Sequence, residues 1–319
     1  MKTTSIRTAL VAGAATLSLA LAACGGGQTA DGSGSEGGAS GSVAVDGSST
    51  VFPLSDAAAE LLSEENPDIQ VSVGAAGTGG GFEVFCQGQT DISDASRPIE
   101  EDEVKACEEG GVEYTELRVA LDALTMVVHP DLAVDCLTTE QVIELWEPGS
   151  KVANWQDLDP SFPDQEISLF GPGTDSGTYD YLAADVIADE SETTRDDYEA
   201  SEDDNVLVQG VSGTEGATGY FGYTYYEENQ DSLKALAIDD GEGCVEPSAE
   251  TASDGTYTPL SRPLFIYVNS AEYGDNEAVK AYVDYYIGNL AEIAEIAQYI
   301  PLNDEQYGET QDALASVGG

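Results

Sequence analysis

A short apolar run, a loop of glycine and hydroxyl residues, and a helical pattern follow one another three times in this 319-residue chain. Each apolar run is typical of a buried strand, so each loop lies between the end of a strand and the start of a helix. Such alternation predicts an α/β fold with mostly parallel sheets, whose ligands bind beyond the carboxyl ends of the strands. The three loops span residues 46–53, 74–82 and 171–178.

The chemistry of the third loop favours an anion as the ligand. Ser176 is expected near an N-cap, and a helix start has backbone N–H groups without intrahelical partners and partial positive charge. Glycines let the chain approach a ligand closely, and the hydroxyls of Ser176 and Thr178 add donors. One such loop alone would more often be an ordinary capped helix, but three together favour an oxyanion site. Residues 74–82 match neither a Walker A nor a dinucleotide-binding motif, because no lysine follows and the spacing differs.

The rest of the chain supports the same architecture. The helix after the first loop is expected to end at Asn66, before Pro67, and Thr138 with Gln141 predicts a capping box. The aromatic cluster within residues 220–226 is expected to pack in the core or at interfaces. Further strands are expected at 42–45, 69–73, 121–128, 167–170, 217–221 and 264–268, further helices at 138–146 and 179–188, and one long helix at 276–299.

The N-terminal residues have the layout of an export signal. Lys2 and Arg7 flank the start of an apolar stretch at residues 9–22, which is too short to predict a membrane span. It ends in a sequence around Cys24 that resembles the cleavage site of bacterial lipoproteins, in which the cysteine becomes the lipidated first residue. We therefore predict a lipoprotein signal peptide at 1–23, lipidation at Cys24, and a flexible Gly- and Ser-rich tether at 24–42.

Four further cysteines remain, an even number in an exported chain, and disulfides are the expected state. Four cysteines allow three pairings. We favour Cys86 with Cys107, which closes a short local loop, and Cys136 with Cys244, which would tie together a middle domain. A zinc site made of all four is disfavoured because no CxxC spacing occurs.

The charge of the chain is extreme, with 61 acidic and 10 basic residues and a formal net charge of −51. Nucleic acid is excluded as a partner, because its backbone requires basic patches. Acidic runs are expected to be solvated faces, in keeping with a salty habitat, and calcium is a minor alternative because no EF-hand spacing appears. The electric field of this negative charge repels anions, but salt screens it over a Debye length of about 8 Å at physiological ionic strength.

Arg97 is one of the few cations, and it follows Ser96 in an expected turn within residues 91–99. In so acidic a chain an arginine is usually a salt-bridge partner. Beside a serine in a turn it could instead grip an oxyanion with two parallel N–H groups.

Together, residues 47–53, 77–81, 91–99 and 175–178 resemble the phosphate-binding lipoproteins of bacterial ABC phosphate importers. The resemblance covers nearly all of the chain from Val43 onward. It implies a class II periplasmic-binding-protein fold, with lobe 1 at 43–122 plus 262–319, lobe 2 at 123–261, and a hinge between them. It also implies a monomer that uses no cofactor, captures inorganic phosphate between the lobes and delivers it to a membrane permease.

Residue by residue, the resemblance implies donors to the phosphate oxygens from all three loops. Two departures stand out: Pro172 occupies the place of an arginine, and Ser96 the place of an aspartate that accepts a proton from the ligand. We hypothesise that Arg97 replaces the missing guanidinium and that Asp94 or Asp175 supplies the acceptor. The implied donors are the hydroxyls of Ser49, Thr50 and Thr78, the amide of Val51, and Ser176, Gly177 and Thr178.

Three other functions compete with this interpretation. An enzyme that used Ser176 and His129 would need a base within reach and usually a G-x-S-x-G elbow, which is absent from the sequence. Another tetrahedral oxyanion such as sulfate, molybdate or tungstate fits the same loops, because Ser96 is not a carboxylate. An acidic cell-surface structural protein would explain the charge but not the three glycine-hydroxyl loops.

Overall fold

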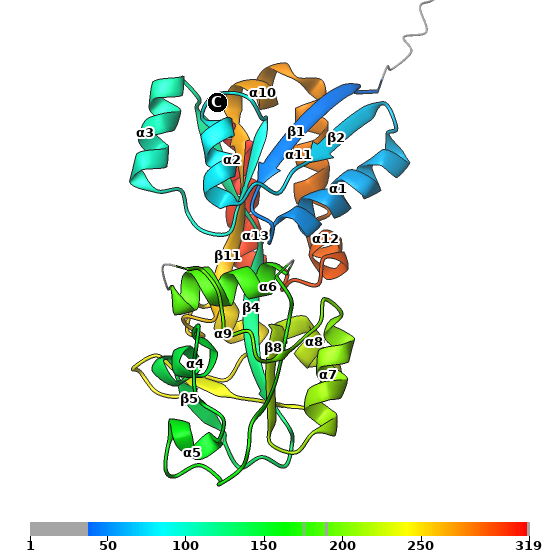
Figure 1. Cartoon of the computed structure of the whole chain (residues 1–319). Coiled ribbons are helices and arrows are strands. Elements are labelled where there is room, and N and C mark those ends of the chain that lie inside the picture. Colours follow the sequence, from blue (N-terminus) through cyan, green and yellow to red (C-terminus); the bar gives the residue numbers. More distant parts are fainter. Residues whose placement is uncertain (1–37, 175, 189–190, 318–319) are drawn as a thin grey trace, which may run out of the picture. The chain divides into compact units, whose positions relative to one another are not determined.

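A computed structural model describes residues 38–174, 176–188 and 191–317, and Figure 1 shows the arrangement of their helices and strands. The predicted signal peptide, Cys24, most of the predicted tether and Asp175 lie outside these residues. None of the helices within them has the length and apolar character to cross a membrane.

A mixed sheet organises the described residues, in the order β2-β1-β3-β11-β4-β8-β6-β7, with β9 beside β4. Strands β2, β1 and β3 are parallel to one another, as are β8, β6 and β7, whereas β11 and β4 run antiparallel to their neighbours. A second sheet pairs β5 with β10. The strands are β1 (Gly41–Gly47), β2 (Ile69–Val73), β3 (Ile92–Ala95), β4 (Tyr114–Val128), β5 (Cys136–Thr138), β6 (Ser168–Gly171), β7 (Glu199–Ala200), β8 (Ala217–Gly222), β9 (Lys234–Ala235), β10 (Ala237–Asp239) and β11 (Ser261–Asn269).

Helices follow most of the strands, as the alternation in the sequence predicts. Thr138 forms the predicted capping box with Gln141 at the start of α4, and Ser176 is the N-cap of α6. The helices are α1 (Phe52–Glu65), α2 (Thr78–Phe85), α3 (Glu101–Gly110), α4 (Thr139–Trp146), α5 (Trp155–Leu158), α6 (Gly177–Asp180), the π-helix η1 (Tyr181–Ile187), α7 (Asp204–Gly213), α8 (Tyr223–Asn229), α9 (Ala249–Ser253), α10 (Ser270–Asp275), α11 (Glu277–Gly288), α12 (Leu290–Ile296) and α13 (Asp304–Ala315).

Strand β4 is longer than the predicted 121–128 and connects two hydrophobic cores. Its first part pairs with β11 and its last five residues pair with β8. One set of core residues packs β1, β2 and β3 against α1, α11 and α12, and another packs the second half of β4, β6 and β8 against α4 and η1. In Figure 1, β4 and β11 run between these two groups of elements.

Two helix predictions need correction. The long helix expected at 276–299 is broken, because Asn289 has a non-helical backbone (φ −116°, ψ 20°) that ends α11 and precedes α12. The helix expected at 179–188 begins earlier, at Gly177, and continues from Tyr181 as a π-helix. The apolar spacing of these segments indicates neither change.

The favoured disulfide pairing is confirmed. Cys86 is bonded to Cys107, which joins the end of α2 to α3, and Cys136 is bonded to Cys244. Within the aromatic cluster, Tyr220 and Phe221 are fully buried in the core as expected.

Candidate functional site

The first loop is shaped by a close backbone approach at the end of β1. Gly47 has φ +144°, and a Cβ there would lie 2.1 Å from the carbonyl oxygen of Asp94, so only glycine fits. The amide of Ser48 donates to that same carbonyl at 2.9 Å. This contact turns the chain towards α1, and Ser48, Ser49 and Thr50 line a cavity of about 420 Å³.

The second loop meets the first at the carboxyl ends of β1 and β2, as predicted. The amide of Gly77 donates to the carbonyl of Gly47 at 2.8 Å, and Gly77 has φ +82°. Thr78 and Gly79, which open α2, line the same cavity. The Thr78 hydroxyl also accepts a hydrogen bond from the amide of Ser96 at 3.2 Å.

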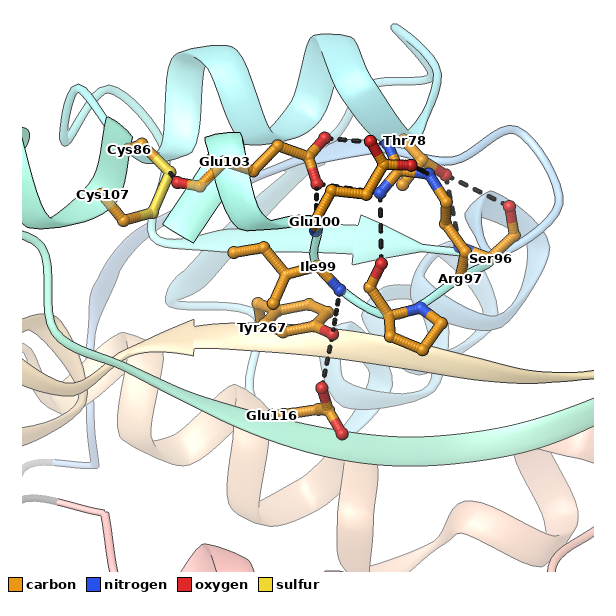
Figure 2. A network of polar contacts seen from close by, with 11 residues as sticks. Thr78, Cys86, Ser96, Arg97, Ile99, Glu100, Glu103, Cys107, Glu116 and Tyr267 are labelled. Carbon is orange, nitrogen blue, oxygen red and sulfur yellow. Dashed lines mark hydrogen bonds and ion pairs between the residues drawn. A yellow bond between two sulfur atoms is a disulfide. The ribbon is translucent and has the colours of Figure 1, made fainter. Parts of the chain in front are cut away.

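Arg97 lines this cavity, but most of its guanidinium is already bonded (Figure 2). Two parallel bonds of 2.8 Å join it to the carboxylate of Glu103 on α3, and its Nε lies 3.3 Å from Glu100. The hydrogen bonds that Arg97 donates to Glu103 raise the pKa of Arg97 above its ordinary value. A further bond goes to the carbonyl of Pro98, so Arg97 acts first as an ion-pair partner of α3.

The same network reaches the strands behind the cavity. In Figure 2 the Tyr267 hydroxyl lies between Ile99 and Glu116. It accepts from the amide of Ile99 at 2.9 Å and donates to the Glu116 carboxylate at 2.5 Å. These bonds fix the turn that carries Ser96 and Arg97 against β11 and β4.

The third loop approaches the first loop directly. A Cβ on Gly177 would lie 2.8 Å from the Thr50 hydroxyl oxygen and 3.0 Å from its Cα, so the absence of a side chain allows this contact. The Ser176 hydroxyl accepts from the amide of Thr178, which caps α6. Ser176, Gly177 and Thr178 are not among the described residues that line the cavity, whereas Asp180, at the end of α6, is.

Arg262 is the cation of this site that sequence reasoning missed. It lies at the start of β11 with its side chain 10% exposed, and it lines the cavity. Its Nη2 donates to the Thr50 hydroxyl at 3.0 Å, its Nε to Asp122 at 3.2 Å, and its Nη1 to Asp185 at 2.6 Å. The guanidinium also stacks 3.7 Å from the centre of the Tyr181 ring. The small number of basic residues could have indicated Arg262, because in so acidic a chain each arginine is a candidate for binding an anion.

Carboxylates surround this arginine. Asp122 is almost completely buried, and burial raises its pKa although Arg262 opposes the shift. Burial also raises the pKa of Asp185, against the attraction of Arg262 and Arg97. Asp180, Asp185 and Glu192 line the cavity, which therefore contains both anion donors and acidic groups.

Asp94 does not line the cavity, although the hypothesis placed a proton acceptor there. Its carboxylate is fully buried between β3 and α1, where one oxygen accepts from the hydroxyl of Ser55 on α1 at 2.9 Å and the other has no partner. Burial raises its pKa to about 8, against the Ser55 hydrogen bond and with the help of Asp46. Val51 is also buried, and its amide donates to the carbonyl of Ser48 at 3.2 Å, so both residues support the loop from behind.

The described residues offer neither a metal cluster nor a pair of catalytic groups of the kind considered above. No group of three or more His, Cys, Asp or Glu side chains among them could hold a metal ion. His129 accepts from the amide of Asp131 at the end of β4 and is not a cavity residue, and no hydrogen bond between it and Ser176 is found in this part of the chain. The hydroxyls and guanidinium groups that do line the cavity are donors to which an oxyanion can bond.

Comparisons with known proteins agree with this geometry. A family model described as the PBP superfamily domain matches residues 32–289. The chain is 45% identical over 268 residues to protein SphX of Synechococcus elongatus, covering 83% of this chain and 79% of that protein. It is 40% identical over 304 residues to phosphate-binding protein PstS of Staphylococcus saprophyticus, covering 95% and 92%. The crystal structure of a possible phosphate binding protein from Planctomyces limnophilus matches with a TM-score of 0.83 and 41% identity, over 88% of this chain and 99% of that one.

Proposed function

Because this chain belongs to the family of the PBP superfamily domain, we propose that it binds inorganic phosphate between two α/β lobes and delivers it to the permease of an ABC importer. The observation that carries the proposal is the cavity at the carboxyl ends of β1 and β2, with hydroxyls from two loops and the guanidinium of Arg262. Relatives named as phosphate-binding proteins support phosphate as the oxyanion.

The hydroxyls and amides of the loops provide the neutral donors to phosphate. Ser49, Thr50, Thr78 and Ser96 come from three different strand ends, so they can surround a tetrahedral ion. Gly177 lies next to Thr50, and with Ser176 and Thr178 it completes the proposed donor set when the lobes move together. The backbone N–H groups of this helix start add partial positive charge.

Arg262 is the residue that we assign to the guanidinium role left open by Pro172. Its contacts use three of its five N–H groups, so two remain for a ligand. Arg97 makes three hydrogen bonds, to Glu103 and Pro98, and a further ion pair to Glu100, so fewer of its N–H groups remain. Charge-assisted bonds from Arg262 offset the desolvation of phosphate, because they are about twice as strong as neutral ones.

Equilibrium binding of radiolabelled phosphate to the purified chain starting at Ser42 tests the proposal. We expect saturable binding at one site, and sulfate and molybdate as unlabelled competitors distinguish phosphate from other oxyanions. Equal displacement by sulfate would mean a general oxyanion binder. If none of the three anions bound, the result would favour the alternative of an acidic cell-surface structural protein.

Substitution of the two cavity arginines tests the assignment of the guanidinium. Arg262→Lys keeps the charge beside Asp122 but loses the fork, and we expect about tenfold to hundredfold weaker phosphate binding, or roughly 1.4–2.8 kcal/mol. Arg97→Lys should change binding less than about threefold. Lys105→Gln, which removes a cation that is 67% exposed, is the control. The reverse order of the two arginine effects would restore Arg97 to the central role.

The lobes that we propose are residues 43–122 with 262–319, and residues 123–261. Two separate cores support this division, since the first contains Leu117 and Ile266 and the second Leu124 and Leu260; Leu121 and Ile300 of the first lobe also pack in the second core. Small-angle scattering with and without phosphate tests it: closure of two lobes predicts a smaller radius of gyration with ligand.

The location that we propose is outside the cytoplasm, on the membrane, with lipid on Cys24 and a monomeric chain. The layout of residues 1–24 supports an exported lipoprotein. Cys24→Ala should move the protein from the membrane fraction to the soluble fraction, and sedimentation of the chain starting at Ser42 should give one protomer. Retention of the Cys24→Ala protein on the membrane would contradict the anchor.

A further inference from the structure

Two carboxylates already occupy anion donors of the cavity. The Ser49 hydroxyl donates to Oδ2 of Asp180 at 3.0 Å. Nη1 of Arg262 donates to Oδ2 of Asp185 at 2.6 Å. Ser49 follows β1 and Arg262 opens β11, whereas both carboxylates come from the segment formed by α6 and η1. The bonds therefore reach from one of the proposed lobes to a segment of the other.

Asp180 is the last residue of α6 and Asp185 lies in the π-helix η1, so the change from α to π geometry falls between two residues that line the same cavity. In an α-helix, side chains at i and i+5 point in well-separated directions, because neighbours on one face are three or four residues apart. A π-helix has i→i+5 hydrogen bonds, which bring residues five apart to nearly the same face. The amide of Ala188 donates to the carbonyl of Ala183 in this pattern, and Asp180, Ala184 and Asp185 all line the cavity.

We infer that Asp180 and Asp185 are an internal substitute for the ligand, which holds Ser49 and Arg262 in place until phosphate displaces the two carboxylates. This inference rests on the proposed function. Within the described residues, two N–H groups of Arg262 are free for the ligand, but the Ser49 hydroxyl and the N–H bonded to Asp185 are not. A phosphate oxygen that accepts from these two donors must lie where the carboxylate oxygens now lie, 3.0 and 2.6 Å from them. Two anions cannot share those positions, so the carboxylates must leave or the ligand cannot bind there.

The consequence is that these two residues set the affinity of the site. In the absence of ligand they accept hydrogen bonds from the guanidinium of Arg262 and the hydroxyl of Ser49. Breaking these bonds costs free energy, which weakens phosphate binding. The two carboxylates also explain how an anion site exists in a chain of net charge −51, because its cations remain paired while the site waits. Since competition acts on charge and position, it affects every tetrahedral oxyanion similarly.

Neutral, nearly isosteric variants test the inference. Asp185→Asn and Asp180→Asn keep an acceptor for Arg262 and Ser49 but remove the negative charge. We expect each to bind phosphate about tenfold more tightly than the unsubstituted chain, and sulfate to be strengthened by a similar factor in the same competition assay. Asp231→Asn removes an equal charge from an exposed residue that does not line the cavity, and should leave both affinities unchanged.

Thermal unfolding gives a second measurement. Without ligand, Asp185→Asn should melt about 2 °C below the unsubstituted chain because the ion pair to Arg262 is lost. With saturating phosphate the difference should disappear or reverse, because the ligand has then replaced the bond from Arg262 to residue 185 in both proteins. The difference in melting temperature without ligand does not depend on phosphate binding. It therefore tests the ion pair of Asp185 even if the proposed function is wrong.

Two outcomes would overturn the inference. Weaker phosphate binding by Asp185→Asn, with sulfate unchanged or stronger, would mean that the carboxylate stays in the site and accepts the proton of the ligand. Affinities equal to those of Asp231→Asn would mean that neither carboxylate competes with the ligand.

Discussion

Arg262 joins four parts of the chain through one guanidinium. It lies opposite Asp122 in the pairing of β11 with β4, contacts Thr50 after β1, and reaches Asp185 and Tyr181 on η1. Local sequence patterns cannot predict this bridging role of Arg262, because its partners lie between 77 and 212 residues away. Arg97 was predictable as a cavity residue for the opposite reason, since its neighbours Ser96 and Glu103 are local.

The contact of Gly177 with Thr50 gives a prediction about the third loop. In Gly177→Ala the new methyl group would lie 2.8 Å from the Thr50 hydroxyl oxygen, so the two loops must move apart. We expect phosphate binding about tenfold weaker, measured by equilibrium dialysis. Gly213→Ala, where a Cβ meets nothing within 4 Å, is the control and should bind normally. Equal binding by both variants would show that the third loop makes no close contact in the complex.

The buried carboxyl of Asp94 gives a prediction about pH. Its pKa is raised to about 8 by burial, so the folded chain holds a proton there that the unfolded chain releases near pH 4. Stability from this group is therefore present below about pH 4 and is lost as pH rises towards 8. Asp94→Asn lacks this loss, and its free energy of unfolding relative to the unsubstituted chain should rise by up to about 1.4 kcal/mol per pH unit between pH 5 and 7.

Urea unfolding at pH 5, 6 and 7 measures this dependence. The exposed Asp68→Asn is the matched control, and its curve should stay parallel to that of the unsubstituted chain. A parallel curve for Asp94→Asn as well would mean that Asp94 is ionised in the folded chain across this range.

At the scale of elements, local signals predicted most of what surrounds the ligand cavity. Strand β2 has the predicted bounds. The loops at 46–53 and 74–82 lie at strand ends as predicted, because glycine, serine and threonine end a strand through local backbone conformation and local hydrogen bonds. The π-helix η1 and the break at Asn289 were not predictable, since tertiary packing decides them. The acceptor role proposed for Asp94 was misplaced because strand alternation turns its side chain to the core.

The disulfides give a prediction at this scale. Cys136 and Cys244 are 108 residues apart and Cys86 and Cys107 only 21. In the chain-entropy model, removal of the longer link costs about 1.4 kcal/mol more than removal of the shorter one. The two double Cys→Ser variants, compared by urea unfolding without reductant, should differ in this order, and a larger loss for the Cys86/Cys107 pair would mean that strain or packing outweighs loop length.

At the scale of the whole molecule, the negative charge opposes the approach of the ligand that the cavity is proposed to bind. The formal net charge is −51, and its field acts over roughly a Debye length. Inside the cavity, directed donors act at hydrogen-bond distance and are screened much less. Fast capture and tight binding therefore depend on different parts of the chain.

The association rate of phosphate tests this separation. Most charged ligands bind faster at low salt because the protein attracts them, but here we expect the rate constant to rise several-fold between about 0.01 and 0.15 M salt as the repulsion is screened. Stopped-flow mixing of the chain with phosphate would measure it, with the dissociation rate as the internal control. An association rate that falls with salt would show that local cations, and not the net charge, govern approach.

The antiparallel pair of β4 and β11 has a mechanical consequence. Strand β4 has residues in both cores, and β11 begins directly after Leu260 of the second core and continues into the first. Their pairing shifts register between Leu264 and Phe265, two residues after Arg262. A paired ribbon resists free swinging but can be twisted, and a register shift locally increases twist. We expect the two cores to rotate relative to each other by twisting of the β4–β11 pair. Part of the free energy of phosphate binding would then be held as strain in this pair and recovered when phosphate dissociates.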